Sequence, residues 1–557
     1  MSGSKIFGID LGTTYSAIAW IDGFGQPEVL LNENDEPLIP SALYYESSGE
    51  VLVGTVAKKS APIDPSRFVD MIKPNMGEAG SCWSIEGVDH RPEEASALIL
   101  KRLKQIAEER TGQTVTDVII TVPAYFDERQ RHATAQAGKI AGLNVVGLIP
   151  EPTAAAIHYA TTIDADRNVL VYDLGGGTFD VTVIRTGGEE IRVVCVNGDH
   201  RLGGRLWDER LVDHLAQEWR AQTTLAKEPE NDPVARQELL ILAEETKRLL
   251  TARGSVPVRF AFDGAQARIE VTRETFDNLT RDWLDSTISC TRDVVAQAEE
   301  LGTSRIDLIL LVGGSSRMPQ VRARLEQEFP DVEIKLHEPD LSVAKGAAIY
   351  ANNALVQQAY REIAEEYYAR KGALPGPSDQ RVMSELLLRL PGMETAAVEQ
   401  ALASRKVINV CSKSFAVKTR DRGSSQYHLE FLILRNSPVP STQTRRFGTY
   451  SANQDRVEIA VYESSTEARE EKDYPRDPNH PAVQHLKSVW LDLPAGLPEG
   501  HPIEVTYDLS SDGGRLQVSA RDPQSGRSIE DSVALQGAMT EQELREAISR
   551  VDEVILS

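Results

Sequence analysis

Cysteine is scarce in this chain, and the few cysteines form no recognisable pair. The 557 residues include four of them, and no two are spaced as CxxC: Cys82, Cys195, Cys290 and Cys411. Disulfide frameworks and thiolate metal sites depend on paired or regularly spaced cysteines. We therefore expect reduced thiols, as in a cytosolic protein, and neither disulfides nor a cysteine-ligated metal.

Positive charge and long apolar runs are scarce as well. The chain has 60 lysines and arginines against 84 aspartates and glutamates, which gives a net charge of −24. Nucleic-acid binding depends on clustered Lys and Arg, so we expect no nucleic-acid partner. No apolar run approaches the roughly 18 residues of a membrane span, and the N-terminus lacks the basic and apolar regions of a signal peptide. We expect a cytoplasmic protein without membrane contact.

The remaining composition, 41% hydrophobic and 26% charged, is that of an ordinary globular protein with about two to four domains. From residue 5 to about 355, apolar bursts alternate with helical patterns, which predicts an α/β region. Residues 356–405 predict a helical connector, and period-two stretches between 406 and 538 predict an all-β sandwich. The last segment, 539–557, predicts one helix opened by a capping box at Thr540.

Two aspartate-glycine turns carry most of the information that is present. One lies in residues 8–16 (GIDLGTTYS) and the other in residues 172–180 (YDLGGGTFD), each between two apolar stretches. Each therefore predicts a strand, a tight turn and a second strand. Glycine N–H groups can approach an anion closely, threonine hydroxyls add donors, and an aspartate beside phosphate usually serves a divalent cation. We expect a duplicated lobe whose two hairpins clasp one polyphosphate, with Asp10 and Asp173 beside its cation.

A third strand that ends in glycines completes the pattern of a nucleotide site. Residues 306–319 read IDLILLVGGSSRMP, so an apolar strand runs into Gly313 and Gly314. Two glycines would let a flat ring approach the backbone, and Arg317 could stack on that ring. By itself this pattern is equally compatible with a structural turn. Beside the two aspartate-glycine turns, it predicts the nucleoside pocket.

Together the motifs resemble those of the 70-kDa heat-shock chaperone family, within the actin and sugar-kinase ATPase superfamily. The matching stretches are residues 8–16, 122–127, 151–157, 173–183, 197–204, 244–248 and 311–319. The resemblance is close over about residues 5–355 and looser over 410–545. It implies an actin-like two-lobed α/β ATPase domain (1–355), the helical connector (356–405) and an all-β, substrate-binding-like sandwich (406–538). The C-terminal helix (539–557) would stand without the family's helical lid, so this would be a divergent, lidless member.

The resemblance also implies the chemistry of the site. The ligands would be ATP or ADP and a Mg²⁺ ion, and Asp10 and Asp173 would hold this ion through water. The resemblance also allows a K⁺ ion at the site. Lys73 matches the catalytic lysine that positions the attacking water, Glu151 matches the carboxylate that orients it, and Thr178 completes the catalytic set. The other nucleotide-binding positions would be Gly12, Thr13, Thr14, Tyr15, Gly175, Gly176, Gly177, Gly204, Glu244, Lys247, Arg248, Gly313, Gly314, Ser315, Arg317 and Asp340.

Two further groups of residues follow from the resemblance. Pro123 and Arg131 match a relay between the nucleotide and peptide domains. The peptide-binding positions, two in an apolar pocket and two arching over it, would be Val457, Ile459, Arg420 and Tyr450. The residues alone allow plainer interpretations. Lys73 could be a solvated charge, Glu151 could simply end a strand, and the two apolar pocket residues could belong only to the sandwich core.

The sequence departs from the family pattern in four places. The stretch between Lys73 and Pro92 is short, which could alter the docking of an exchange factor. The family's GGEDFD becomes GGRLWD at 203–208, so we expect Arg205 to add positive charge beside the nucleotide cleft. The interdomain linker becomes SRKVINV at 404–410, which puts interdomain coupling in doubt although its apolar residues could still dock as a strand. An arginine at position 420 would favour acidic or polar clients.

These features leave two function hypotheses. The first is an ATP-driven, slowly hydrolysing, chaperone-like protein that binds unfolded or extended polypeptides, with a J-domain co-chaperone and a nucleotide-exchange factor as further partners. The alternative is an ATP-gated scaffold or adaptor that binds one dedicated protein partner without general chaperone activity. Small-molecule phosphorylation, as in sugar kinases, is disfavoured by the EPTAAA motif at 151–156 and by the C-terminal sandwich.

Overall fold

The computed structural model describes most of the chain. The described residues are 5–46, 49–78, 80–162, 166–188, 190–223, 227–371, 376–377, 379–421, 426–466, 471–510, 516–532 and 539–556. Residue 538, the predicted end of the sandwich, and residues 1–4 of the predicted ATPase domain lie outside them. Within these ranges, no helix is both long enough and apolar enough to cross a membrane.

A six-stranded mixed sheet is formed around the first aspartate-glycine turn. Its strand order is β11-β10-β1-β2-β3, and β4 pairs with β2. β1 and β2 are antiparallel on either side of the turn, whereas β10 lies parallel to both β1 and β11. The strands are β1 (Phe7–Leu11), β2 (Tyr15–Ile21), β3 (Pro27–Val29), β4 (Ile39–Pro40), β10 (Asp117–Val122) and β11 (Asn144–Pro150). We call this the first sheet.

A seven-stranded sheet, the second sheet, is formed around the second aspartate-glycine turn. Its order is β18-β17-β12-β13-β14-β19-β22. The sequence of β17, LILLV, is buried throughout, as expected for a strand covered on both faces. The strands are β12 (Arg167–Leu174), β13 (Phe179–Gly187), β14 (Glu190–Asp199), β17 (Leu308–Val312), β18 (Glu333–Leu336), β19 (Lys406–Val410) and β22 (Pro438–Val439).

Helices pack against both sheets, and several begin at residues that satisfy free backbone N–H groups. The side chain of Asp127 accepts a hydrogen bond from the N–H of Gln130 at the start of α3. The side chain of Asp232 likewise accepts from the N–H of Ala235 at the start of α6. The helices of the α/β part are α1 (Thr55–Ser60), α2 (Pro92–Thr111), α3 (Glu128–Ile140), α4 (Glu151–Ala160), α5 (Gly204–Thr223), α6 (Pro233–Leu250), α7 (Arg273–Leu279), α8 (Arg281–Glu300), α9 (Pro319–Glu328) and α10 (Ser342–Lys371).

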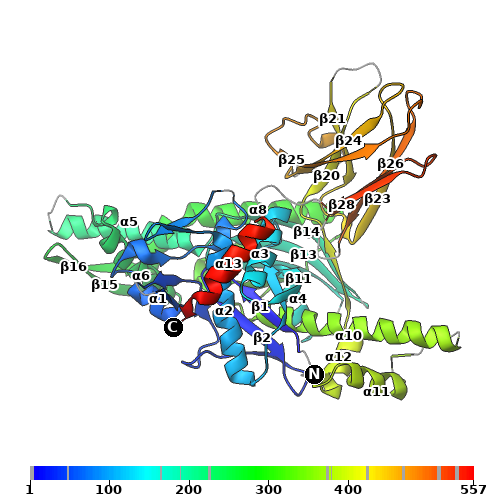
Figure 1. The fold of residues 1–557 in the computed structure, drawn as a ribbon. Helices are drawn as coiled ribbons and strands as arrows, with labels where there is room; N and C mark the ends of the chain where they lie inside the picture. Colours follow the sequence, from blue (N-terminus) through cyan, green and yellow to red (C-terminus); the bar gives the residue numbers. More distant parts are fainter. Residues whose placement is uncertain are drawn as a thin grey trace.

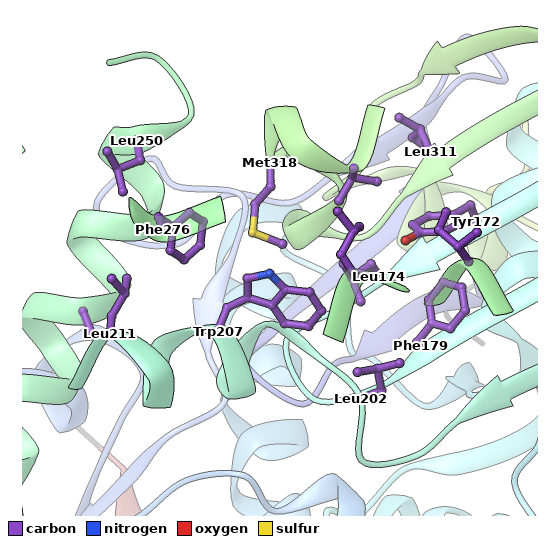
Figure 2. Close-up of a cluster of buried hydrophobic side chains, with 14 of the residues drawn as sticks. Tyr172, Leu174, Phe179, Leu202, Trp207, Leu211, Leu250, Phe276, Leu311 and Met318 are labelled. Atoms are coloured by element: carbon purple, nitrogen blue, oxygen red, sulfur yellow. The ribbon is translucent and has the colours of Figure 1, made fainter. Parts of the chain in front are cut away.

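The core beside the second sheet supports the second aspartate-glycine turn. Tyr172 and Phe179, which flank that turn, pack in one cluster with Trp207 of α5 and with Met318 (Figure 2). Trp207 is fully buried, and the hydroxyl of Tyr172 donates to Thr287 Oγ1 at 2.6 Å. Because both strands of the hairpin are packed in this way, the turn between them is held on a rigid platform.

The predicted boundary between residues 355 and 356 falls inside α10, so the predicted ATPase domain and the predicted connector share one continuous helix (Figure 1). The end of α10 packs with α11 (Gln380–Arg389) and α12 (Thr395–Leu402) through buried side chains such as Val356, Leu386 and Val398. The Asn352 amide of α10 also donates to the Ala397 carbonyl at 3.2 Å. The connector is therefore a small helical cluster attached to the α/β part.

The predicted sandwich consists of two four-stranded antiparallel sheets, with orders β21-β20-β24-β25 and β23-β26-β27-β28. Apolar side chains from both sheets, including Val461 and Tyr507, form its core. Figure 1 shows it projecting from the α/β part. The strands are β20 (Ser414–Thr419), β21 (His428–Ile433), β23 (Ser441–Gly448), β24 (Arg456–Ser464), β25 (Val483–Asp492), β26 (Pro502–Leu509), β27 (Leu516–Arg521) and β28 (Ser528–Ser532).

Two small strand pairs and one further sheet complete the α/β part. β8 pairs with β9, β15 pairs with β16, and the sheet has the order β29-β6-β5-β7. Their strands are β5 (Leu43–Tyr45), β6 (Glu50–Val53), β7 (Phe68–Val69), β8 (Trp83–Ile85), β9 (Val88–His90), β15 (Ser255–Phe262), β16 (Ala265–Thr272) and β29 (Ile555–Leu556).

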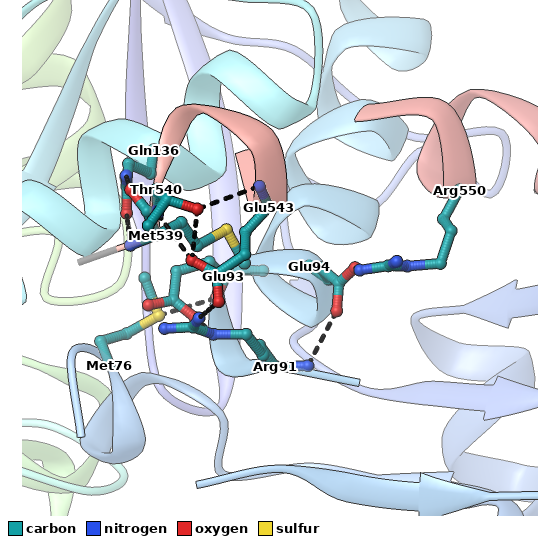
Figure 3. A network of polar contacts seen from close by, with 10 residues as sticks. Met76, Arg91, Glu93, Glu94, Gln136, Met539, Thr540, Glu543 and Arg550 are labelled. Carbon is teal, nitrogen blue, oxygen red and sulfur yellow. Dashed lines mark hydrogen bonds and ion pairs between the residues drawn. The ribbon is translucent and has the colours of Figure 1, made fainter. Parts of the chain in front are cut away.

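The C-terminal helix α13 (Glu541–Glu553) packs on the α/β part, against α2 and α3 (Figure 3). Gln136 of α3 forms two hydrogen bonds with the backbone of Met539, at 3.1 and 3.3 Å, and Arg550 Nε donates to Glu94 at 2.8 Å. The predicted capping box at Thr540 is present. The expectation of one helix to the end was wrong, because α13 stops at Glu553 and the short strand β29 that follows it pairs with β6.

Candidate nucleotide site

The two aspartate-glycine turns line one cavity of about 440 Å³. The first turn lies between β1 and β2 and the second between β12 and β13, while the glycines after β17 form a third part of the wall. Nearly all predicted catalytic and nucleotide-binding residues lie around this cavity, namely Asp10, Gly12, Thr13, Thr14, Tyr15, Lys73, Glu151, Asp173, Gly175, Gly176, Thr178, Glu244, Lys247, Arg248, Gly313, Gly314, Ser315, Arg317 and Asp340.

The two predicted residues that do not line the cavity, Gly177 and Gly204, lie directly behind its wall. A Cβ atom on Gly177 would lie 2.5 Å from Cγ2 of Thr13, so only glycine allows the two turns to meet there. The Gly204 carbonyl accepts from Lys247 Nζ at 2.9 Å. Both residues therefore pack against residues that line the cavity.

Asp10 and Asp173 are buried carboxylates whose negative charge is poorly compensated. Thr121 Oγ1 donates to Asp10 at 3.0 Å. Burial, together with the nearby Glu151, raises the pKa of Asp10 to about 7, and the same causes raise the pKa of Asp173 well above its usual range. A cation would relieve this repulsion and keep both groups ionised, so the pair fits Mg²⁺. Among the described residues, no three His, Cys, Asp or Glu side chains are placed to hold a metal together.

Lys73 and Glu151 form a buried ion pair in the same cavity. Lys73 opens the 3₁₀ helix η2 (Lys73–Asn75), Glu151 is the first residue of α4, and Lys73 Nζ donates to Glu151 Oε1. Their side chains are only 5% and 12% exposed, so the plainer interpretation of Lys73 as a solvated charge does not hold. An ammonium buried at the wall of this cavity can neutralise developing negative charge strongly, because water screens it little.

The residues predicted around the nucleoside come from α6 and from the segments after β17 and β18. Glu244, Lys247 and Arg248 lie on α6 and line the cavity. Arg317 Nε donates to Asp340 Oδ2 at 2.9 Å, so these two predicted residues hold each other in place. The planar guanidinium is thereby fixed at the cavity edge, as stacking on a flat ring would require.

Sequence reasoning missed two ion pairs that join distant parts of the chain beside this cavity, around a smaller one of about 60 Å³. Lys58 of α1 pairs with Glu244, which also accepts a hydrogen bond from the Tyr15 hydroxyl at 2.8 Å. The guanidinium of Arg205 pairs with Asp70 at 2.9 Å. The expectation that Arg205 adds positive charge to the cleft was therefore wrong, because Asp70 neutralises it. Neither pair had a local sequence signal, since its partners are far apart in the chain.

The predicted relay residues both contact Phe126, in the segment after β10. Pro123 directly follows β10, and its carbonyl accepts from the Phe126 N–H at 3.2 Å. The buried guanidinium of Arg131 donates to the Phe126 carbonyl at 3.1 Å, and Ser412, just after β19, donates to the same carbonyl at 3.3 Å. The segment therefore contacts the start of the sandwich region directly.

The altered linker docks as a strand. β19 runs parallel to β14 in the second sheet, between β14 and the edge strand β22, with Val407 opposite Ile191 and Ile408 opposite Arg192. A second contact lies nearby, where the Arg435 guanidinium donates to the Val196 carbonyl at 2.9 Å. The sandwich is thus attached to the sheet that carries the second aspartate-glycine turn.

The four predicted peptide-binding residues line one cavity of about 690 Å³ in the sandwich. Ile459 is almost fully buried and belongs to the sandwich core as well, so for this residue both interpretations hold. The guanidinium of Arg420 stacks on the rings of Tyr450 and Tyr427. These contacts place a cation and two aromatic rings at the mouth of an otherwise partly apolar groove.

The fold and the site define a mixed α/β protein that has a cavity lined by charged residues, threonines and glycines, and that carries a β-sandwich before its last helix. The Hsp70 protein family model matches residues 6–86 and 80–364. The chaperone protein DnaK from each of two strains of Halobacterium salinarum is 35% identical over 543 residues, which covers 96% of this chain and 76% of the relative. The chain belongs to the Hsp70 family.

Proposed function

We propose that this protein is a chaperone-like ATPase that binds ATP with Mg²⁺ in the 440 Å³ cavity, hydrolyses it slowly and binds extended polypeptide segments under nucleotide control. Residues 1–355 would form a two-lobed, actin-like ATPase domain, 356–405 the connector, 406–538 the substrate-binding domain and 539–557 a C-terminal helix. One observation carries the proposal: the two aspartate-glycine turns, the Lys73–Glu151 pair and the glycines after β17 meet around one cavity.

The chemistry follows from positioning and charge neutralisation, which are the main demands of phosphoryl transfer to water. The N–H groups of both turns and the hydroxyls of Thr13, Thr14 and Thr178 can donate to phosphate oxygens. Lys73 can neutralise charge on the transferred phosphoryl group, and Glu151 can accept a hydrogen bond from the attacking water. A Mg²⁺ ion held through water by the two buried aspartates would neutralise further phosphate charge.

Nucleotide control of the sandwich is supported by the contacts that join the two parts. β13, which follows the second turn, pairs with β14, and β14 pairs with β19 at the entry to the sandwich. A shift of the second turn on nucleotide binding would therefore act on β19 through one intervening strand. Coupling of this kind requires that peptide prefer one nucleotide state. Membership of the Hsp70 family makes a J-domain co-chaperone and a nucleotide-exchange factor the partners that we propose.

The test is single-turnover ATP hydrolysis by the full chain, with and without a panel of unstructured peptides. We expect slow hydrolysis that peptides accelerate, and a loss of about a hundredfold or more in Lys73→Ala, because a buried charge aimed at the transition state is removed. Lys59→Ala is the matched control, since Lys59 is exposed on α1 away from the cavity lining. An unchanged rate in Lys73→Ala would refute the role of that residue, and an absence of ATP binding would refute the proposal.

A dedicated partner is the second candidate, and the stacked Arg420 favours it. A cation fixed between two tyrosine rings at the groove mouth selects among ligands more strongly than a plain apolar pocket would. Competition by unrelated unfolded peptides separates the two functions. General competition supports the chaperone, and indifference to all of them supports the scaffold or adaptor.

A further inference from the structure

Arg205, the second residue of α5, links the second aspartate-glycine turn to the segment that precedes Lys73. Its backbone N–H donates to the Gly176 carbonyl at 2.7 Å. Its guanidinium Nη1 donates to Asp70 Oδ2 at 2.9 Å, and Glu209, one helical turn further on, lies 3.6 Å from Nε. One residue therefore holds the phosphate-binding turn with its backbone and Asp70 with its side chain.

Asp70 is close to the proposed catalytic lysine along the chain. It lies between β7 and η2, and only Met71 and Ile72 separate it from Lys73. Met71 has a φ of 51°, a left-handed conformation that is costly for this residue type and is kept only where the surroundings fix it. Ile72 is 2% exposed and belongs to the core beneath the first sheet. The segment is therefore stiff, so a displacement of Asp70 would also move Lys73.

We propose that Arg205 is a positioning residue, which through its ion pair with Asp70 sets Lys73 against the second aspartate-glycine turn when the cavity closes around nucleotide. This inference rests on the proposed ATPase function. Arg205 need not touch the nucleotide, because its effect passes through Asp70 to the neighbouring lysine. It also gives a function to the arginine in the GGRLWD sequence that departs from the family pattern.

The electrostatic surroundings favour an ion pair over a free guanidinium at this position. Burial opposes the charge of Arg205, but Asp70, Glu209 and Asp208 outweigh burial and raise the pKa of the guanidinium. The Asp208 carboxylate is already paired with Lys247 at 2.8 Å, which leaves Asp70 as the partner from a distant segment of the chain. The Lys58–Glu244 pair is a second contact between distant segments, and residues of both pairs line a small cavity of about 60 Å³.

The test is a charge swap measured by two assays on the full chain. The variants are Arg205→Glu, Asp70→Arg and the double variant that carries both substitutions. We expect each single variant to lose about ten- to a hundredfold in single-turnover ATP hydrolysis, because small misplacements of a catalytic group are costly. We expect a fluorescent ADP analogue to dissociate only about two- to fivefold faster, since a partly exposed ion pair contributes little to closure itself. The double variant should regain most of both losses.

Three controls keep the inference falsifiable. Arg210→Ala removes an arginine of the same helix whose partner, Asp282 at 2.7 Å, lies outside the cavity, and it should change neither rate. Arg205→Lys keeps a positive charge that can pair with Asp70, so this variant should keep part of the hydrolysis rate. A purely structural role of Arg205 would not predict this partial rescue. Thermal unfolding checks that each variant folds, and Asp70→Asn replaces Asp70→Arg if the latter does not.

The outcomes separate this inference from the proposed function. The role of Arg205 is overturned, without affecting the proposed function, if both single variants hydrolyse ATP at the normal rate. It is also overturned if the double variant loses as much activity as the two single variants together. If the unsubstituted protein binds ADP but never hydrolyses ATP, the inference is tested by the dissociation assay alone. Equal dissociation rates of the ADP analogue in all variants then overturn the inference. An unsubstituted protein that binds no nucleotide overturns the proposed function and this inference with it.

Discussion

The contact between the sandwich and the α/β part contains a buried acid, Glu463, whose charge state should depend on docking. Glu463 lies on β24 and is 6% exposed. Burial first, and the negative charge of Asp127 second, raise its pKa from an ordinary 4.5 to about 7, although Lys413 and Arg129 oppose the shift. Asp127 and Arg129 belong to the start of α3, so the acid faces residues across the interface. We predict that docking of the sandwich favours the protonated form of Glu463.

The sign and size of the effect follow from linkage. Between pH 4.5 and about 7 the docked state still holds the proton that an exposed Glu463 has lost, so docking weakens as the pH rises through this window. The pKa difference corresponds to about 3 kcal/mol at pH values above both pKa values. This is an upper value, because it requires full exposure of the side chain on undocking. Glu463→Gln should remove the pH dependence and strengthen docking at pH 8.

Hydrogen exchange of the β19 backbone amides at pH 5.5 and pH 8, corrected for intrinsic exchange, measures docking directly. Glu504→Gln is the matched control, since Glu504 lies on β26 of the same sandwich and pairs with Arg446 at 2.7 Å. Protection of β19 should fall with rising pH in the unsubstituted protein and in the control, but not in Glu463→Gln. The same pH dependence in all three proteins would refute the reasoning.

Three further predictions concern the two cavities and the C-terminal helix. Gly176→Ala would place a Cβ atom 2.2 Å from Thr14 Oγ1, so nucleotide affinity measured by calorimetry should collapse, and unchanged affinity would show that the close approach is not needed. Arg420→Ala should weaken binding of acidic peptides by about threefold to tenfold and of neutral peptides less, as followed by fluorescence anisotropy; an equal loss for both would contradict a charge effect. Met539→Ala should lower the stability of the α/β part by about 2–4 kcal/mol in denaturant titrations without affecting peptide binding, and an unchanged midpoint would show that this contact contributes nothing.

The parts of the fold that could be predicted from sequence are those fixed by local chemistry. The turns at Asp10 and Asp173 require glycine at the bend and apolar strands on both sides, and both features are visible along the chain. The Thr540 capping box and the period-two strands of the sandwich were predictable for the same reason. The linker strand β19 was expected to remain able to dock because of its apolar residues, and it pairs with β14.

The parts that could not be predicted depend on contacts between residues distant in the chain. Asp70 and Arg205 are 135 positions apart, and Lys58 and Glu244 are 186 apart, so neither ion pair leaves a periodic or local pattern. The packing of α13 on α2 and α3 could not be predicted from the sequence either. Its apolar face at Ala547 and Val551 shows that it must pack against something, but the sequence does not say against which surface.

The docking of α13 makes the sandwich an insertion rather than an appendage. The chain enters the sandwich through β19, which is paired with the second sheet, and after the sandwich it returns to α13, whose apolar face joins the core beneath the first sheet. A domain held at both ends by the same body has few rigid-body motions available, chiefly rotation about the line that joins its two attachments. Any ligand held by the sandwich would therefore move within a restricted range relative to the nucleotide cavity. Cutting the chain between the sandwich and α13 would leave the sandwich held only from the β19 side, by the pairing of β19 with β14 and by contacts such as that of Arg435 with the Val196 carbonyl.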